Sequence, residues 1–199
     1  MVKELTRLFY WILFFLKTGY LRNVHNITEV GAGKSTRVQT VLSLFLFRGK
    51  FLSVDYASVS PPKARWILFK PEFIKTNFFN LKTTTKLLIF DHSVDDILAG
   101  MIDKHPDQKK YDLLMDNIKL FNYSNSKFIH QISRVLTHAK TLISGDGRII
   151  ISNYLTKYDK KRGTMAITLQ LLPQLSKIAK QLNLKVDYLS NRFLVFKNN

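Results

Sequence analysis

A carboxylate and two glycines stand close together early in this sequence, as Glu29, Gly31 and Gly33. Glycine has no side chain, so such a turn lets the backbone approach a ligand closely and adopt a positive φ. We expect the next helix to begin near Ser35, with its free N–H groups directed back at the turn. Because the carboxylate of Glu29 attracts cations and repels phosphates, the segment predicts a site for a ligand that carries a cationic or amine group.

A second carboxylate, Asp55, ends the next apolar run. Residues 27–55 are predicted to form a strand-helix-strand unit. The segment begins with an apolar run and a glycine turn, continues as a helix of about four turns that stops at Gly49, and ends with a further apolar run. Such a unit binds nucleotide-like ligands at the carboxyl ends of its parallel strands. An acid at the end of the second strand can accept hydrogen bonds from both hydroxyls of a ribose.

Two other nucleotide-binding patterns use part of the same turn. Gly33-Lys34-Ser35 matches the second half of the phosphate-binding pattern G-x-x-x-x-G-K-[ST], but the first glycine of that pattern falls on Thr28. The nicotinamide fingerprint G-x-G-x-x-G would need a glycine where Thr36 stands. An NTPase that uses Lys34 stays open as an alternative, as does a glycine turn with no ligand.

A third carboxylate lies beside a histidine, as Asp91 and His92, directly after the apolar run that ends at Phe90. We expect this run to be a buried strand next to the first one, at the topological switch point where ligands bind in open α/β sheets. A histidine of near-neutral pKa can take a proton from a substrate oxygen or nitrogen, with the aspartate orienting it. Asp91 and His92 are therefore our candidates for catalysis; the alternative is a structural histidine at a helix start.

The rest of the chain supplies the elements that would position these residues. We expect a short helix from about residue 60 to 69, a third strand within 72–81, an amphipathic helix over 126–142 and a fifth strand over 148–152. A helix through about Leu182 should lead to a terminal hairpin of residues 184–189 and 192–197.

The pattern Glu29-x-Gly31-x-Gly33-x-Ser35, with Asp55 closing the second strand, resembles motif I and its partner acid in the class I S-adenosylmethionine-dependent methyltransferases. Ser35 replaces the usual third glycine. The resemblance implies that S-adenosylmethionine is the cofactor. Glu29 would hold the methionine amine of the cofactor indirectly, and Asp55 would bind the ribose hydroxyls. Gly31 and Gly33 would let the cofactor backbone lie close to the turn, and Ser35 would stand at the same turn.

Further residues take their roles from the same resemblance. Asn77 aligns with an acid that meets the adenine amino group in the family, and its amide can still accept from that amine. Asp91 would lie beside the cofactor, and Asp91 and His92 would face the methyl group. The tetrapeptide Asn-Pro-Pro-Tyr of the amino-group-methylating branches is absent at this site, so the resemblance does not identify the methyl acceptor.

The resemblance covers about residues 26–197 and implies an α/β fold, a three-layer Rossmann-like arrangement with a seven-stranded, mostly parallel sheet and a C-terminal antiparallel hairpin. We expect residues 1–199 to form a single domain, with 1–24 as a hydrophobic N-terminal helix and 26–197 as the cofactor-binding core. At 199 residues and 46% hydrophobic composition, the chain can build one sizeable core. A non-catalytic module of this fold that binds membrane or RNA is the alternative.

The chain is strongly basic, with a formal net charge of +17 and no cysteine. Such a charge attracts RNA, DNA or anionic lipid, although the basic residues are scattered along the sequence. A basic cluster at residues 157–162 favours an anionic methyl acceptor. The absence of cysteine excludes thiolate metal ligands and is compatible with a reducing cytoplasm; we expect no metal site.

Residues 5–16 of the N-terminal segment are almost wholly apolar. Within this segment, residues 8–16 are apolar without a break, and this run is shorter than the roughly twenty residues of a bilayer span. It predicts a helix that packs over the cofactor domain, contacts a partner, or lies in a membrane interface with basic residues at the headgroups.

Overall fold

The computed structural model describes residues 2–31, 35–55, 69, 71–91, 93, 126–152, 172–190 and 192–199. Their strands form one seven-stranded sheet in the order β3-β2-β1-β4-β5-β7-β6. The strands are β1 (Asn26–Val30), β2 (Lys50–Asp55), β3 (Pro71–Lys75), β4 (Thr85–Asp91), β5 (Ile143–Ser152), β6 (Leu184–Leu189) and β7 (Phe193–Asn198). Strands β1 to β5 run parallel, and β7 is antiparallel to both β5 and β6. The predicted fold class, including the terminal hairpin, is confirmed.

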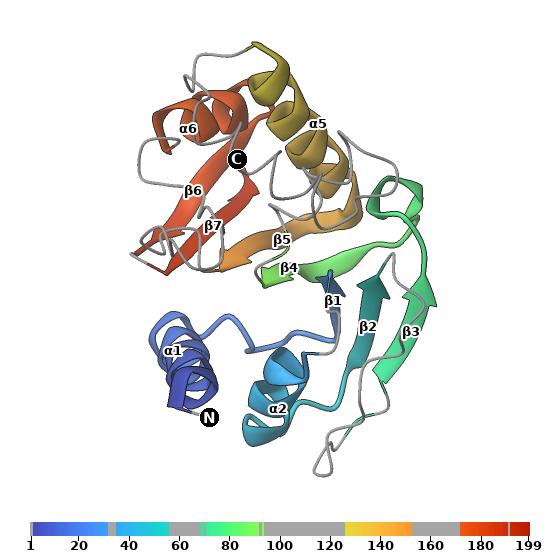
Figure 1. Cartoon of the computed structure of the whole chain (residues 1–199), viewed down its shortest axis with the longest axis vertical. Helices are drawn as coiled ribbons and strands as arrows, with labels where there is room; N and C mark the ends of the chain where they lie inside the picture. The colour runs from blue at the N-terminus through green and yellow to red at the C-terminus, as the bar shows by residue number, and fades with distance from the viewer. Residues whose placement is uncertain are drawn as a thin grey trace.

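One layer of helices covers each face of the sheet, so the fold has three layers (Figure 1). α1 (Val2–Thr18) and α2 (Arg37–Leu44) lie on one face, and α5 (Ser126–Leu142) and α6 (Leu172–Gln181) lie on the other; a short 3₁₀ helix, η1 (Phe78–Asn80), precedes β4. β4 shows how one strand serves both layers. Its Leu87 and Ile89 belong to the core under α1 and α2, whereas Leu88 and Phe90 belong to the core under α5 and α6, because successive side chains point to opposite faces.

α1 uses one face to cover the sheet. Trp11, Phe14 and Phe15 are buried, and the Phe14 ring stacks on Phe193 of β7 with centroids 4.1 Å apart. The N-terminal helix therefore packs over the sheet. Among the helices of the described residues, none is long and apolar enough to cross a membrane.

α2 is shorter than expected: it ends at Leu44, not at Gly49, and spans 8 residues. Leu46 adopts a φ of 54°, and the Phe47 N–H donates to the Leu42 carbonyl at 3.0 Å. This turn lets the ring of Phe47, which is buried, pack against Phe69. The gain from burying an aromatic ring offsets the positive φ, an effect that helical periodicity does not register.

β5 also differs from its expected bounds, since it begins at Ile143 directly after α5 rather than at Arg148. The residues between the predicted helix and the predicted strand form an irregularity inside β5, where the pairing with β4 shifts register between Thr85 and Leu87. The predicted helix over 126–142 is confirmed as α5. Residues 60–68 of the predicted short helix and the basic cluster at 157–162 lie outside the described residues.

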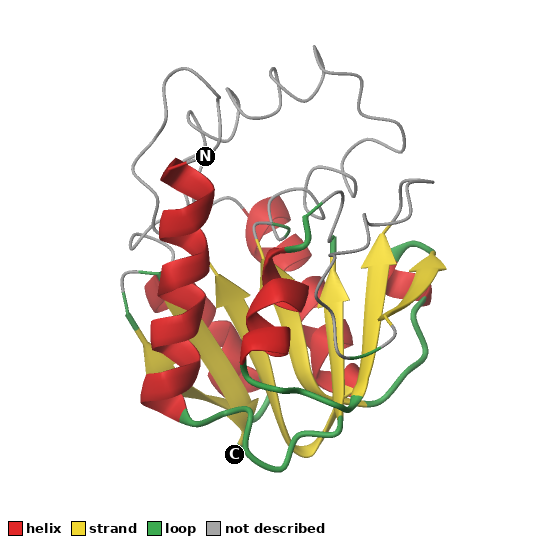
Figure 2. Ribbon diagram, turned by 90° about the horizontal axis from the view of Figure 1, so that it is seen from below, coloured by secondary structure: helices red, strands yellow, loops and turns green. Residues whose placement is uncertain are grey.

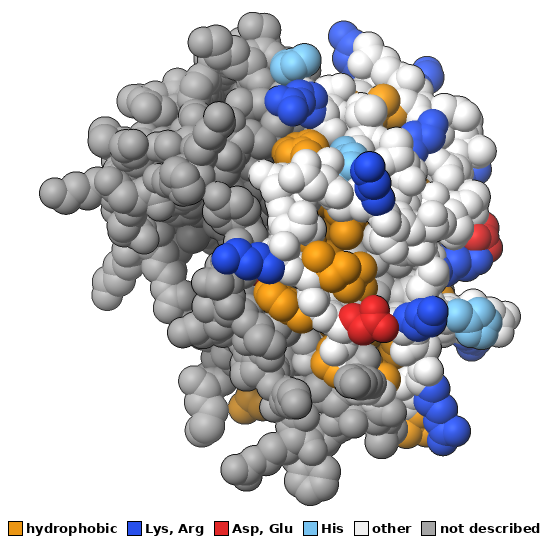
Figure 3. Space-filling model, turned by 90° about the vertical axis from the view of Figure 1, so that its right-hand side faces the viewer, with side chains coloured by type: hydrophobic (Ala, Val, Ile, Leu, Met, Phe, Trp, Pro, Cys, Tyr) orange, Lys and Arg blue, Asp and Glu red, His pale blue; other side chains and the backbone are white. Residues whose placement is uncertain are grey.

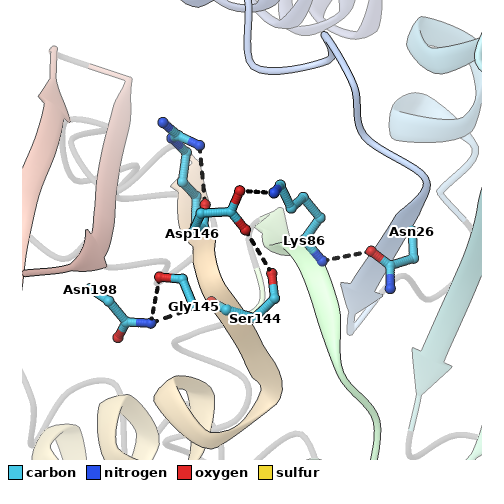
Figure 4. A network of polar contacts seen from close by, with 7 residues as sticks. Asn26, Lys86, Ser144, Gly145, Asp146 and Asn198 are labelled. Atoms are coloured by element: carbon cyan, nitrogen blue, oxygen red, sulfur yellow. Dashed lines mark hydrogen bonds and ion pairs between the residues drawn. The ribbon is translucent and has the colours of Figure 1, made fainter.

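A polar network joins the amino ends of β1, β4 and β5 to the carboxyl end of β7 (Figure 4). The Lys86 N–H donates to Asn26 Oδ1 at 2.8 Å, and the Lys86 ammonium pairs with Asp146. Asn198, at the end of β7, donates to the Ser144 carbonyl at 3.3 Å. This network joins β1, β4, β5 and β7 at the edge opposite the carboxyl ends of β1 to β4.

Basic side chains are spread over the visible face that carries the β3 edge (Figure 3). Lys and Arg lie among apolar and neutral side chains there rather than in one dense patch. The scatter of charge along the sequence is thus also a scatter in space on this face.

Candidate functional site

Three carboxylates meet at the carboxyl edge of the sheet. β1 lies between β2 and β4, and Val30 is in register with both Val54 and Phe90. Glu29, Asp55 and Asp91 therefore come to the same edge, where both aspartates act electrostatically on Glu29. The structure brings these three predicted site residues together. Gly33 and His92 lie outside the described residues.

Glu29 is the least satisfied group of the described site. Its side chain is buried, with 1% of the residue exposed, and within the part of the chain that the structure describes neither carboxylate oxygen has a hydrogen-bond partner. Burial raises the pKa of Glu29 well above its ordinary value; the charge of Asp91 and then that of Asp55 act in the same direction, against the opposing charge of Arg37. Buried polar groups are nearly always paired, which makes the Glu29 carboxyl a candidate for contact with a ligand.

Arg37, which sequence reasoning missed, supplies the cation of this cluster. It is the first residue of α2, its Nε lies 3.4 Å from Asp91 Oδ2, and its side chain is 11% exposed. Its Nη2 also donates to the Ser35 hydroxyl at 3.2 Å. A cation at a helix N-terminus opposes the helix dipole, and that anomaly in the sequence signals a nearby acidic partner.

Asp91 is bound to three elements. Its Oδ1 accepts a hydrogen bond from Trp11 Nε1 of α1 at 3.3 Å and another from the Ser152 hydroxyl of β5, while Oδ2 faces Arg37 of α2. The carboxylate is buried. Asp91 thus connects α1, α2 and β5 at the carboxyl edge of the sheet. Its catalytic role with His92 stays a prediction.

Gly31 is required by packing as well as by any ligand. Its φ is 70°, and a Cβ at this position would lie 2.3 Å from the Ser93 Cβ. Ser93, which follows β4, donates its hydroxyl to the Val30 carbonyl at 2.5 Å. The glycine therefore lets the chain after β4 close over the turn after β1.

Asp55 and Asn77 lie further along the same edge. Asp55 ends β2, and its carbonyl accepts from the Thr76 N–H at 3.0 Å. Asn77 is exposed, and its Oδ1 accepts from the Phe79 N–H at 2.9 Å, which caps η1. An amide oxygen has two lone pairs, so this cap leaves one acceptor position for an adenine amine. The ribose and adenine assignments stay predictions.

Comparisons with solved structures identify the fold. The chain is similar to magnesium protoporphyrin IX methyltransferase from Synechocystis with bound S-adenosylhomocysteine (13% identity, TM-score 0.58, 98% of this chain and 82% of that one). It is also similar to CalO1, a methyltransferase in calicheamicin biosynthesis, over 87% of this chain (13% identity, TM-score 0.57). A third is an S-adenosylmethionine-dependent methyltransferase from Clostridium acetobutylicum (11% identity, TM-score 0.52, 95% of this chain and 91% of that one).

The chain spans about half the length of CalO1, 49%, so the match covers one part of that protein. No protein-family model matches the sequence, and no curated protein sequence matches it. With identities this low, the comparisons establish the fold, which is that of the class I Rossmann-like methyltransferases.

Proposed function

We propose that this chain, which has the class I methyltransferase fold, is an S-adenosylmethionine-dependent methyltransferase. The observation that carries the proposal is the buried carboxyl of Glu29 at the carboxyl edge of the sheet, for which the described residues supply no hydrogen-bond partner. S-adenosylmethionine bears an amine and a sulfonium, and both positive charges suit a site with three carboxylates and one guanidinium.

The residues present fit this cofactor. In the proposal, Glu29 accepts from the methionine amine directly or through a water, Asp55 accepts from the ribose hydroxyls, and the turn at Gly31 passes close to the cofactor. The start of α2 lies close by in the chain, where the Arg37 N–H donates to the Ser35 hydroxyl at 3.3 Å. Arg37 keeps Asp91 oriented and balances part of the negative charge, so that the cofactor is bound without leaving two adjacent anions unpaired.

Bound S-adenosylmethionine would supply an already activated methyl group. The chain then has to align the acceptor with the methyl group and exclude water, which is how enzymes convert proximity into rate. We propose His92, the residue after Asp91, as the group that takes the acceptor proton. The net charge of +17 favours an acceptor with an anionic group.

Isothermal titration calorimetry with S-adenosylmethionine tests the proposal. Wild-type protein should bind, and Glu29→Gln and Asp55→Ala should each weaken binding at least about tenfold. The first removes the negative charge that would face the cationic amine, and the second removes the acceptors of the ribose hydroxyls. Glu72→Gln is the matched control, because it removes a carboxylate from an exposed position on β3. The control should bind like the wild type.

Three outcomes would contradict the proposal. Failure of the wild type to bind at millimolar cofactor favours a non-catalytic module of the same fold. Magnesium-dependent nucleotide binding that Lys34→Ala abolishes favours the NTPase alternative. An affinity unchanged by Asp55→Ala removes the ribose assignment.

A further inference from the structure

The outer face of α1 is apolar and uncovered. Leu5, Phe9, Leu13 and Leu16 are 59%, 56%, 45% and 65% exposed. Their spacings of four, four and three residues place them along one side of the helix. We call these four residues the outer stripe of α1. The stripe lies opposite Trp11, Phe14 and Phe15, which cover the sheet.

This arrangement departs from that of an ordinary surface helix, which buries one stripe and presents polar residues to water. α1 stays attached to the core while its outer stripe is exposed. Its Trp11 donates to Asp91, and Tyr20, just after the helix, donates to Asp187 of β6 at 2.7 Å. Figure 2 shows α1 along one side of the sheet, roughly in line with the strands, so that its length is presented outward. The outer stripe is thus held in place ready for contact.

Charge distinguishes between the surfaces that could cover the stripe. Lys17 is exposed next to Leu16, and Arg22 is exposed shortly after the helix. With a net charge of +17, two copies of this chain repel one another, whereas an anionic surface attracts each of them. The four side chains also expose on the order of 400 Å², about half of the roughly 800 Å² per partner in a stable protein interface.

We propose that the outer stripe of α1 docks the protein onto the surface of a membrane that contains anionic lipids. Leu5, Phe9, Leu13 and Leu16 enter the boundary between headgroups and acyl chains, and Lys17 contacts lipid headgroups. A helix of 17 residues with an apolar face and flanking cations lies in the plane of such an interface. The docking does not depend on the cofactor or on methyl transfer.

Co-sedimentation of the full chain with vesicles tests this proposal. The protein should bind phosphatidylcholine vesicles with about 30% phosphatidylserine at least tenfold more tightly than vesicles of phosphatidylcholine alone, and added salt should weaken the binding. The double variant Phe9→Ser/Leu16→Ser should lose at least tenfold in partitioning, because it removes two membrane-inserting side chains. Ile74→Ser is the control, since Ile74 is 43% exposed on β3 at the far edge of the sheet.

A second measurement does not depend on a disruptive substitution. The chain has no cysteine, so Leu13→Cys gives a single site for a nitroxide label. The oxygen accessibility of the label should rise when anionic vesicles are added, while a label at Ile74→Cys should not change.

The proposal is overturned if the wild type fails to bind anionic vesicles, or if the double variant, with unchanged circular dichroism and melting temperature, binds like the wild type. It is also overturned if sedimentation shows a dimer that the double variant dissociates, because the stripe is then an interface between copies. A label at residue 13 that stays in water in the presence of vesicles contradicts membrane docking as well.

Discussion

At the scale of single residues, Glu29 shows a conflict between stability and binding. Its carboxyl is buried and finds no hydrogen-bond partner among the described residues, and its pKa is raised, chiefly by burial. Relative to the unfolded chain, which ionises above the ordinary pKa of about 4.3, folding therefore favours the neutral form of Glu29. A residue that lowers stability in the free protein is retained where a ligand uses it.

The raised pKa of Glu29 determines how the stability of the fold depends on pH. Below the unfolded pKa both states bind the proton and Glu29 costs no ionisation energy. As pH rises above it, the unfolded chain gives up a proton that the folded chain keeps, so stability falls until pH reaches the raised folded pKa. Glu29→Gln removes this loss and should stabilise the cofactor-free protein by about 1 kcal/mol at pH 8, and by less at pH 5. Thermal unfolding at the two pH values measures it; a less stable variant at pH 8 would refute the assignment.

At the scale of elements, a second charged cluster attaches α1 to the hairpin. Asp187 of β6 accepts hydrogen bonds from Tyr20 and from Arg148 Nε at 2.8 Å, and pairs with Lys197 of β7. The Arg148 guanidinium also lies 4.4 Å from the centre of the Tyr20 ring. Residues from the end of α1, β5, β6 and β7 are thus joined through one carboxylate that is 11% exposed.

Burial alone would raise the pKa of Asp187, but the hydrogen bonds from Lys197, Arg148 and Tyr20 outweigh it and lower the pKa to about 2. A depressed pKa stabilises the fold at pH above the unfolded value, and this contribution is lost as pH falls from about 4 to about 2. Asp187→Asn should therefore cost at most about 2 kcal/mol at pH 7 and flatten the acid limb of the stability curve. Urea unfolding from pH 7 to pH 3 tests this. Asp146→Asn is the comparison, since Asp146 is an exposed acid paired with Lys86.

At the scale of the whole molecule, the strand order β3-β2-β1-β4-β5-β7-β6 places the ends of β1 and β4 side by side at the centre of the sheet. Consecutive connections run outward from β1 on one side and from β4 on the other, which makes this the topological switch point. The central strands are buried on both faces, so the position of the site is as rigid as the core itself.

Cofactor binding at this point should stabilise the described sheet as a unit. A ligand that binds only the folded chain adds about 2.7 kcal/mol at a hundred times its dissociation constant. S-adenosylmethionine should therefore raise the melting temperature of the wild type by several degrees, and much less for Asp55→Ala. Differential scanning calorimetry measures the shift. An equal rise in both proteins would place the ligand away from Asp55.

The strand order, and with it the meeting of Glu29, Asp55 and Asp91 at one edge, was expected from the resemblance to the class I methyltransferases. The single strands were predicted from local patterns in the sequence, because strand periodicity is a short-range property. The terminal hairpin, β6 with β7, was predicted for the same reason. Only the tertiary structure decided where α2 ends, since the burial of Phe47 outweighs the conformation at Leu46.

The contacts of Asp91 were also decided by tertiary structure alone. Trp11 is 80 residues away in the chain and reaches Asp91 only because α1 packs across the sheet. The same packing divides the apolar segment into a buried face and the outer stripe of α1, a division that an unbroken apolar run cannot show. The periodicity of the sequence predicts which side chains are apolar enough to be buried, but only long-range packing decides which residues they contact.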